Sequence, residues 1–320
     1  MLYRLIKPFA VLIIKICFKK IYINNRNLLS NNGPFLLASN HPNSFLDAIL
    51  LCILFKKPVY ALTRGDAFKK KWAAKILHAL HMLPVYRERE GTENLHHNYK
   101  TFDKCLKILE QGGIILIFSE AFCVNEWHLR PIKKGTARLA AMAWEKNIPL
   151  QILPVGLNYS NFYKTGKIVH INFGSAIDQK NIINDPLEKG KLLNKITENI
   201  QQQLNKLVYK IDNGDTALLK KHFIQDAYFT KKILLFFPAI IGFVLHSPVY
   251  YPLAKFIYYK TKKTGHSDSI ITALFFLTYP FFIALYTVVA YSLLNNWYGL
   301  LCIIILPFCA WCYTQFINPV

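Results

Sequence analysis

The middle of the chain alternates short apolar runs with longer segments of helical periodicity. Apolar runs of four to six residues predict strands, and apolar positions that recur every three or four residues predict helices. An α/β domain with a mostly parallel sheet flanked by helices is expected from strands that alternate with helices at this spacing. The predicted domain comprises residues 26–230, with strands at residues 35–38, 59–62, 114–118, 150–155 and 168–173 and helices at residues 43–55, 72–80, 93–110, 135–146 and 186–208.

The pattern changes in residues 231–320, where two long segments contain no charged residue. Residues 269–294 are uncharged over 26 positions and residues 297–316 over 20. Each segment is long enough to cross a hydrocarbon layer of about 30 Å as a helix. We therefore expect a transmembrane helical hairpin that turns at Asn295 and Asn296. Two buried core helices are the alternative, but neither segment has a polar face.

Two further segments are apolar but are too short, or contain too many charged residues, for a transmembrane helix. Residues 233–245 are apolar over only 13 positions and run into a proline-containing stretch, so residues 233–252 predict a re-entrant or interfacial segment. Within residues 1–25, the helical period gathers Arg4, Lys7, Lys15 and Lys19 on one side. This pattern predicts an amphipathic helix on the membrane surface, with an amphipathic core helix as the alternative.

Charge narrows the choice of partner. Residues 1–230 hold 33 Lys and Arg against 17 Asp and Glu, and residues 231–320 hold 6 against 1. A basic excess attracts anionic lipid, phosphorylated substrates or nucleic acid, and the apolar region favours the lipid bilayer. The nearest candidate for nucleic-acid binding, Lys69–Trp72, is explained equally well by a membrane surface, so no nucleic-acid partner is expected.

The lysines near the expected hairpin predict its orientation. Residues 255–263 contain four lysines before the first uncharged segment, whereas the Asn295–Asn296 turn contains none. Cytoplasmic loops carry the excess of Lys and Arg in membrane proteins. We therefore expect an integral membrane protein with its α/β domain on the cytoplasmic side.

A candidate catalytic pair follows the first predicted strand of the α/β domain. The segment Asn40-His41-Pro42-Asn43-Ser44-Phe45-Leu46-Asp47 ends that strand and opens a helix, which is where α/β sheets present ligand-binding groups. Asp47, in the first turn of the helix, can reach back to one imidazole nitrogen of His41 and leave the other free to accept a proton. The alternative is a capping box between Ser44 and Asp47, which would make the carboxylate purely structural.

Further polar residues follow other apolar runs. Arg87 comes after residues 82–85, and Glu120 ends the run at residues 114–118. Arg130 and Lys134 lie in the basic stretch that leads into the next helix. A base, an acid and several cations on neighbouring loops suit an anionic substrate that carries a hydroxyl group.

These residues resemble the motifs of the glycerolipid acyltransferase superfamily, which includes lysophosphatidic acid and glycerol-3-phosphate acyltransferases. The first motif, Asn-His-spacer-Asp, is matched by Asn40, His41 and Asp47. The second ends in an apolar-x-Arg and is matched around Arg87; the third, Phe-Pro-Glu-Gly, is partly matched by residues 118–121. The fourth, an apolar-Pro-Val strand, is matched around Pro154. The four motifs occur in order over about residues 35–160.

Three features depart from the family pattern. Five residues separate His41 from Asp47, where four are usual. Ala121 replaces a glycine, and Cys123 stands where an arginine is expected. The resemblance therefore assigns phosphate binding to Arg87, with Arg130 or Lys134 as its partner.

The resemblance implies transfer of an acyl group from acyl-CoA or acyl carrier protein, as co-substrate, to a hydroxyl of glycerol 3-phosphate or a lysophospholipid. His41 would be the general base oriented by Asp47, Glu120 would contact the glycerol moiety, and Pro154 would line the acyl-donor groove. No cofactor and no metal are expected. The alternative from another class is a catalytically degenerate, membrane-anchored lipid-binding protein. A serine hydrolase that uses Ser44 fits less well, because the sequence contains no nucleophile elbow. A zinc site fits less well too, because no third ligand accompanies the histidine pairs His78 and His81 or His96 and His97.

Overall fold

The computed structural model describes residues 2–31, 33–86, 95–182, 188–224, 229–261 and 265–320. Within these ranges the centre of the α/β domain is a sheet of seven strands in the order β1-β7-β6-β2-β5-β3-β4. All neighbouring pairs are parallel except β6 and β7, so β7 and β1 run against the other five strands. The expectation of a mostly parallel α/β sheet is confirmed. The strands are β1 (Phe18–Ile23), β2 (Phe35–Ser39), β3 (Val59–Arg64), β4 (Met82–Val85), β5 (Ile114–Phe118), β6 (Gln151–Tyr159) and β7 (Lys167–Phe173).

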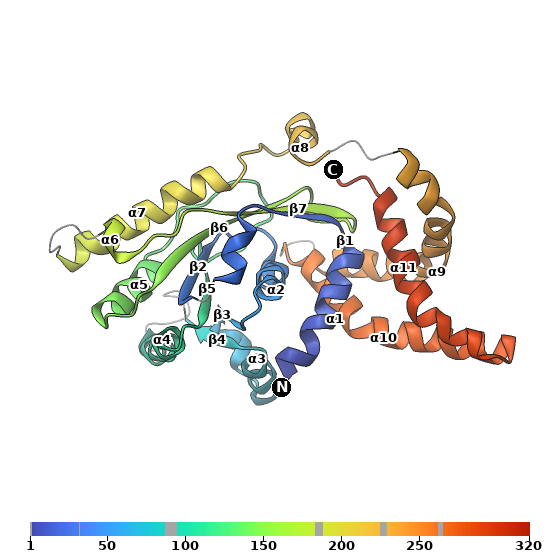
Figure 1. The fold of residues 1–320 in the computed structure, drawn as a ribbon, viewed down its shortest axis with the longest axis horizontal. Helices are drawn as coiled ribbons and strands as arrows, with labels where there is room; N and C mark the ends of the chain where they lie inside the picture. The colour runs from blue at the N-terminus through green and yellow to red at the C-terminus, as the bar shows by residue number, and fades with distance from the viewer. Residues whose placement is uncertain (1, 32, 87–94, 183–187, 225–228, 262–264) are drawn as a thin grey trace.

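Helices cover both faces of the sheet (Figure 1). Successive side chains of a strand point to opposite faces, so Phe35 and Leu37 of β2 belong to one apolar core, and Leu36 and Ala38 to the other. The first core is completed by α1 (Leu2–Cys17) and α2 (Ser44–Leu54), and the second by α4 (Leu95–Glu110), α5 (Gly135–Glu145) and α7 (Lys189–Leu207). β2 is therefore buried on both sides, which explains its continuous apolar sequence.

Shorter elements complete the α/β domain. The helix α3 (Lys71–Ala79) leads into the edge strand β4, and α8 (Thr216–Phe223) follows α7. A single helical turn, α6 (Gln179–Ile182), and two 3₁₀ turns, Arg26–Ser30 and Gly65–Phe68, lie in the connections.

Among the described residues, three helices are long and apolar enough to cross a membrane: residues Ile233–Thr261 of α9 (Phe229–Thr261), α10 (Ser267–Leu294), and the segment Trp297–Phe316. The last comprises a 3₁₀ turn, Trp297–Leu301, and α11 (Cys302–Phe316). Many of their large apolar side chains are exposed, which suits contact with lipid rather than water. Asn295 adopts a left-handed conformation at the end of α10 and so forms the tight turn that the sequence predicts.

The helix α9 bends and packs against both other membrane helices (Figure 1). Near its start Leu235 contacts Cys312 of α11, and near its end Ile257 contacts Ile271 of α10. Both contacts lie close to the α/β domain, because α11 ends there and α10 begins there. Helix bends commonly occur at prolines, and α9 contains Pro238, Pro248 and Pro252. The segment predicted over residues 233–252 thus belongs to a longer helix than expected, and its re-entrant path stays a prediction.

The N-terminal segment differs from the prediction of one amphipathic helix over residues 1–25. The helix α1 ends at Cys17, and Phe18–Ile23 forms the edge strand β1, paired with β7. Ile13 and Ile14 of α1 are buried in the core, whereas Leu5 is exposed. The sequence did not predict this strand, because its lysines interrupt the apolar pattern of residues 18–23. An edge strand exposes alternate side chains and can carry charged residues there.

Candidate active site

The candidate site lies where β2 and β5 end next to each other. Ser39, the last residue of β2, is level with Phe118, the last residue of β5. His41 and Glu120 each follow two residues later, so the sheet register places them side by side at the carboxyl edge of the sheet, where α/β proteins bind ligands. We call residues 40–47, which join β2 to the first turn of α2, the catalytic loop.

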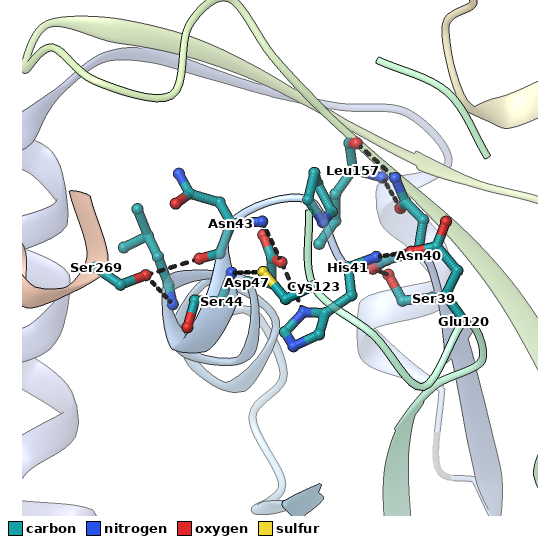
Figure 2. A network of polar contacts seen from close by, with 12 residues as sticks. Ser39, Asn40, His41, Asn43, Ser44, Asp47, Glu120, Cys123, Leu157 and Ser269 are labelled. Carbon is teal, nitrogen blue, oxygen red and sulfur yellow. Dashed lines mark hydrogen bonds and ion pairs between the residues drawn. The ribbon is translucent and has the colours of Figure 1, made fainter. Parts of the chain in front are cut away.

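His41 and Asp47 form the predicted pair (Figure 2). The Nδ1 atom of His41 lies 2.9 Å from Oδ2 of Asp47. The aspartate is fully buried, while 18% of the histidine side chain remains exposed. The imidazole also stacks on Phe118, with ring centroids 3.8 Å apart, which fixes its plane. With Nδ1 facing the carboxylate, Nε2 is the nitrogen that can accept a proton from a bound molecule.

Two other donors hold the carboxylate of Asp47. The backbone N–H of Asn43 donates to Oδ2 over 2.8 Å, and the hydroxyl of Tyr159 donates to Oδ1 over 2.6 Å. Burial raises the pKa of Tyr159, so this hydroxyl keeps its proton and remains a donor. A carboxylate that accepts from three groups has one allowed orientation. The contacts thus support Asp47 as a group that orients His41.

The carboxylate of Glu120 holds the catalytic loop through backbone hydrogen bonds. Its Oε2 accepts the backbone N–H of His41 over 2.7 Å, and its Oε1 accepts that of Arg130 over 2.9 Å. Burial raises its pKa from 4.5 to about 7, against the opposing effect of these two hydrogen bonds. The glutamate therefore ties the catalytic loop to the loop that follows β5.

The side chain of Asn40, the first residue of the family motif, bonds to the backbone of a neighbouring strand. Its side-chain oxygen accepts the backbone N–H of Leu157 over 2.7 Å, and its amide nitrogen donates to the Leu157 carbonyl over 3.0 Å. Leu157 belongs to β6, the other neighbour of β2. Asn40 is buried, so this paired contact replaces the sheet hydrogen bonds that end with Ser39.

The two residues that depart from the family motif keep the local structure intact. Ala121 has φ of 55°, a left-handed conformation that glycine adopts without strain. Cys123 accepts the backbone N–H of Ser44 over 3.0 Å. Burial raises the pKa of Cys123 to about 12, so it is a neutral thiol and a poor nucleophile.

A groove of about 2700 Å³ passes His41 and Glu120. We call the apolar side chains that α1, α3 and α10 contribute to its lining the apolar arm; they include Ile6, Ala10, Ile76, Leu77, Ala273 and Phe276. We call the cations that line it just before and within the first turn of α5 the cationic arm; they are Lys133, Lys134 and Arg138. The groove thus combines room for a hydrocarbon chain with positive charge, and His41 lies along the same groove.

The structure places the other predicted site residues as follows. Arg87 lies outside the described residues, although β4, which precedes it, ends at the same edge of the sheet as β3. Lys134 lines the cationic arm. The guanidinium of Arg130 pairs with Glu126, and its backbone N–H donates to Glu120.

Pro154, which the resemblance assigns to an acyl-donor groove, lies inside the sheet. It is a buried residue within β6, level with Ala38 of β2, and it is not among the residues that line the groove. Its role in the structure is therefore packing inside the sheet, and the geometry gives no support to a contact with the acyl donor.

Sequence reasoning missed Tyr159 and Arg138. Tyr159 lies 112 positions from Asp47, at the end of a strand whose pairing the sequence does not reveal. Arg138 follows Lys134 by one helical turn, so the helical period from Lys134 was a usable signal.

The rival sites find little support in the geometry. In the described part of the chain, no recorded hydrogen bond joins the Ser44 hydroxyl to His41. His78 lies near the carbonyl of Met82, and His81 stacks between Tyr3 and Tyr60. No cluster of three potential metal ligands occurs among the described residues.

Comparison with known proteins now identifies the domain. Residues 20–158, from β1 to the end of β6, match the family model described as Acyltransferase. The matched segment contains the residues of all four motifs named above and agrees with the expected acyltransferase resemblance. No curated protein sequence matches the chain. Among solved structures, the chain is similar to the 1-acyl-sn-glycerophosphate (LPA) acyltransferase PlsC from Thermotoga maritima, with 12% sequence identity, a TM-score of 0.42, and coverage of 64% of this chain and 79% of that chain.

Proposed function

We propose that the protein is a membrane-bound O-acyltransferase of phospholipid biosynthesis. Its reaction would transfer a fatty acyl group from acyl-CoA or acyl carrier protein to a hydroxyl of glycerol 3-phosphate or 1-acylglycerol 3-phosphate. The observation that carries this proposal is the contact of 2.9 Å between His41 Nδ1 and Asp47 Oδ2, placed beside a groove with an apolar and a cationic arm.

The proposed reaction needs one base and no covalent acyl-enzyme. Nε2 of His41 takes the proton of the acceptor hydroxyl as its oxygen attacks the thioester carbonyl. The tetrahedral intermediate then expels the thiolate, which receives the proton from His41. The carbon–sulfur bond breaks, an ester bond forms, and His41 returns to its neutral state.

The groove supports an acceptor or donor that is both anionic and lipidic. Lys134 and Arg138 offer positive charge for a phosphate, and the apolar arm between α1, α3 and α10 offers space for an acyl chain. Arg87, which family resemblance assigns to phosphate binding, stays a part of this proposal. The helices α10 and α11 anchor the domain at the bilayer, where lipid substrates and products reside.

The proposal places the α/β domain on the cytoplasmic side. Residues 231–320 contain six lysines, two at residues 231–232 and four at residues 255–263, whereas the turn at Asn295 has none. By the positive-inside rule this arrangement supports a cytoplasmic domain. A cysteine-accessibility assay on intact cells, with single cysteines introduced at Asn296 and in α8, tests this orientation.

The experiment that tests the function measures acyl transfer by purified protein in detergent. Labelled acyl-CoA and acyl carrier protein are offered with glycerol 3-phosphate, lysophosphatidic acid or neutral lysolipids. We expect His41→Ala to lower kcat by about 10²–10⁴-fold, the usual contribution of general base catalysis. The matched control is His78→Ala, since His78 is an exposed histidine on α3 outside the groove lining.

The same experiment decides between the enzyme and its alternative. Turnover that His41→Ala abolishes and His78→Ala leaves unchanged supports the acyltransferase and names the acceptor. Folded protein that binds lysolipid without transferring an acyl group from any donor contradicts it and favours the degenerate lipid-binding protein.

A further inference from the structure

The first turn of the membrane helix α10 contacts the catalytic loop directly. The hydroxyl of Ser269 donates to the Asn43 carbonyl over 2.8 Å and accepts the backbone N–H of Leu46 over 3.3 Å. The side-chain amide of Asn43 donates to Oδ2 of Asp268 over 2.6 Å. These three bonds connect residues more than 220 positions apart, and Figure 2 shows Ser269 reaching the start of α2.

These contacts satisfy backbone groups that α2 leaves open. The first N–H groups of a helix have no partner within it, and a side chain just before the helix usually caps them. Asn43 precedes α2 but makes no such capping bond. Ser269 of the membrane helix supplies one partner, and Cys123 supplies another at Ser44. The start of α2, which carries Asp47, is thus capped from outside the α/β sheet.

A buried ion pair holds this part of α10 in place. Asp268 is the only acidic residue among residues 231–320, and it pairs with Lys167 at the start of β7. Both side chains are more than nine-tenths buried. A buried carboxylate and ammonium need each other, because either one alone would lose its hydration without compensation. The pair therefore fixes α10 to the sheet at one register.

We propose that Asp268 and Ser269 are positioning residues of the active site, so that the membrane helix α10 is a working part of the catalytic apparatus and not only an anchor. From Asp268 an unbroken series of contacts leads through Asn43 to Asp47 and His41. The proposal concerns the same site as the proposed acyl transfer and rests on it for its kinetic test.

The clearest test variant is Ser269→Ala, because Asp268→Asn leaves the buried charge of Lys167 unpaired and risks misfolding. Ser269→Ala removes both bonds of the hydroxyl and frees the start of α2. Small displacements of a catalytic group cost up to about a hundredfold in rate, so we expect kcat to fall by about tenfold to a hundredfold. KM should change by less than about threefold, because Ser269 holds the loop that carries the base and not the substrate.

The matched control is Thr278→Ala, further along α10. The hydroxyl of Thr278 bonds to the Leu274 carbonyl within the same helix and not to the catalytic loop, and Thr278 is not among the residues that line the groove. We expect this variant to keep the wild-type kcat. Hydrogen–deuterium exchange of the peptide covering residues 41–47 adds a readout independent of activity, and exchange there should accelerate in Ser269→Ala alone.

The outcomes separate this proposal from the proposed function. Equal kcat and equal exchange in Ser269→Ala and Thr278→Ala overturn the positioning role, as does a general loss of exchange protection or thermal stability in Ser269→Ala. If wild-type protein transfers no acyl group, the proposed function fails, while the exchange of residues 41–47 still shows whether α10 orders the loop.

Discussion

Two sets of contacts hold the catalytic loop, one from the sheet and one from the membrane helix α10, and they differ in how far the sequence predicts them. On the side of the sheet, Asn40 bonds to β6, and Glu120, just after β5, bonds to the His41 backbone. On the side of the membrane, Asp268 and Ser269 hold Asn43. The first set lies at strand ends that the register aligns, and the second lies on a helix more than 220 positions away. The contacts on the side of the sheet could be located from the rule that ligand-binding groups follow the carboxyl ends of parallel strands. The contacts on the side of the membrane are visible only in the tertiary structure.

Asp47 receives support from both directions, so its loss should have the largest effect. Asp47→Asn leaves a neutral amide beside Nδ1 of His41, which no longer stabilises the protonated ring and can present the wrong tautomer. We expect kcat to fall by about 10²–10⁴-fold with a small change in KM. Steady-state kinetics on each acceptor measures this. An unchanged kcat would mean that Asp47 only caps α2, as in the alternative of a capping box between Ser44 and Asp47.

Glu120→Gln breaks the sheet-side anchor. The carboxylate accepts two backbone N–H groups, but a glutamine has one accepting oxygen and sets its own N–H₂ against the second donor. We expect a loss of about 1–3 kcal/mol in the free energy of unfolding, since a buried donor loses its partner. A fall in kcat should accompany it because His41 shifts. Denaturation in detergent and acyl-transfer kinetics measure the two effects.

The pH dependence of Glu120 gives this variant a second signature. Burial raises its pKa from 4.5 to about 7, so between these values the folded protein binds more protons than the unfolded chain. The contribution of Glu120 to stability therefore falls as pH rises through this window. Glu120→Gln should remove that part of the dependence. An identical pH profile of unfolding in both proteins would contradict the raised pKa.

Tyr159→Phe sharpens the comparison, because it removes one bond to Asp47 and leaves both anchors of the loop in place. Oδ1 of the buried carboxylate then lacks its partner, which should cost about 1–3 kcal/mol of stability. We expect kcat to fall by less than about tenfold, which is less than 1.4 kcal/mol in the barrier. Tyr209→Phe is the control, since its hydroxyl contacts His170 away from the site and should leave kcat unchanged. A larger fall in kcat for Tyr159→Phe than for Ser269→Ala would contradict this expectation, because it would make the bond from Tyr159 more important for kcat than the contact from α10.

Local pattern predicted the fold best where a strand is buried on both faces. The strand β5 has the predicted bounds, since its five apolar residues lie between two layers of helices. The edge strand β1 was missed, because its lysines fit the helical pattern of the preceding segment equally well. The prolines of α9 are visible in the sequence, but the contacts of α9 with α10 and α11 join distant segments, which no short window of sequence contains.

The candidate site divides in the same way. His41 and Asp47 are predictable because six positions across a strand-to-helix turn bring the two side chains together. Pro154 matches a family motif, but the match alone does not reveal that this residue is buried within the sheet. Tyr159 and Asp268 contact the site only through pairings between distant segments, which hydrophobic periodicity does not encode.

The smallest predicted effect concerns the turn that carries Glu120. Ala121 occupies a left-handed conformation with φ of 55°, which costs an L-residue with a side chain roughly 1–2 kcal/mol. Ala121→Gly relieves this strain but increases the conformational entropy of the unfolded chain, which offsets part of the gain. We expect a net stabilisation below about 1 kcal/mol and an unchanged kcat, because the glycine keeps the same turn and the same position of Glu120. Thermal unfolding in detergent measures the first and acyl-transfer kinetics the second. A destabilised Ala121→Gly protein would mean that the methyl group packs favourably enough to outweigh the strain of the turn.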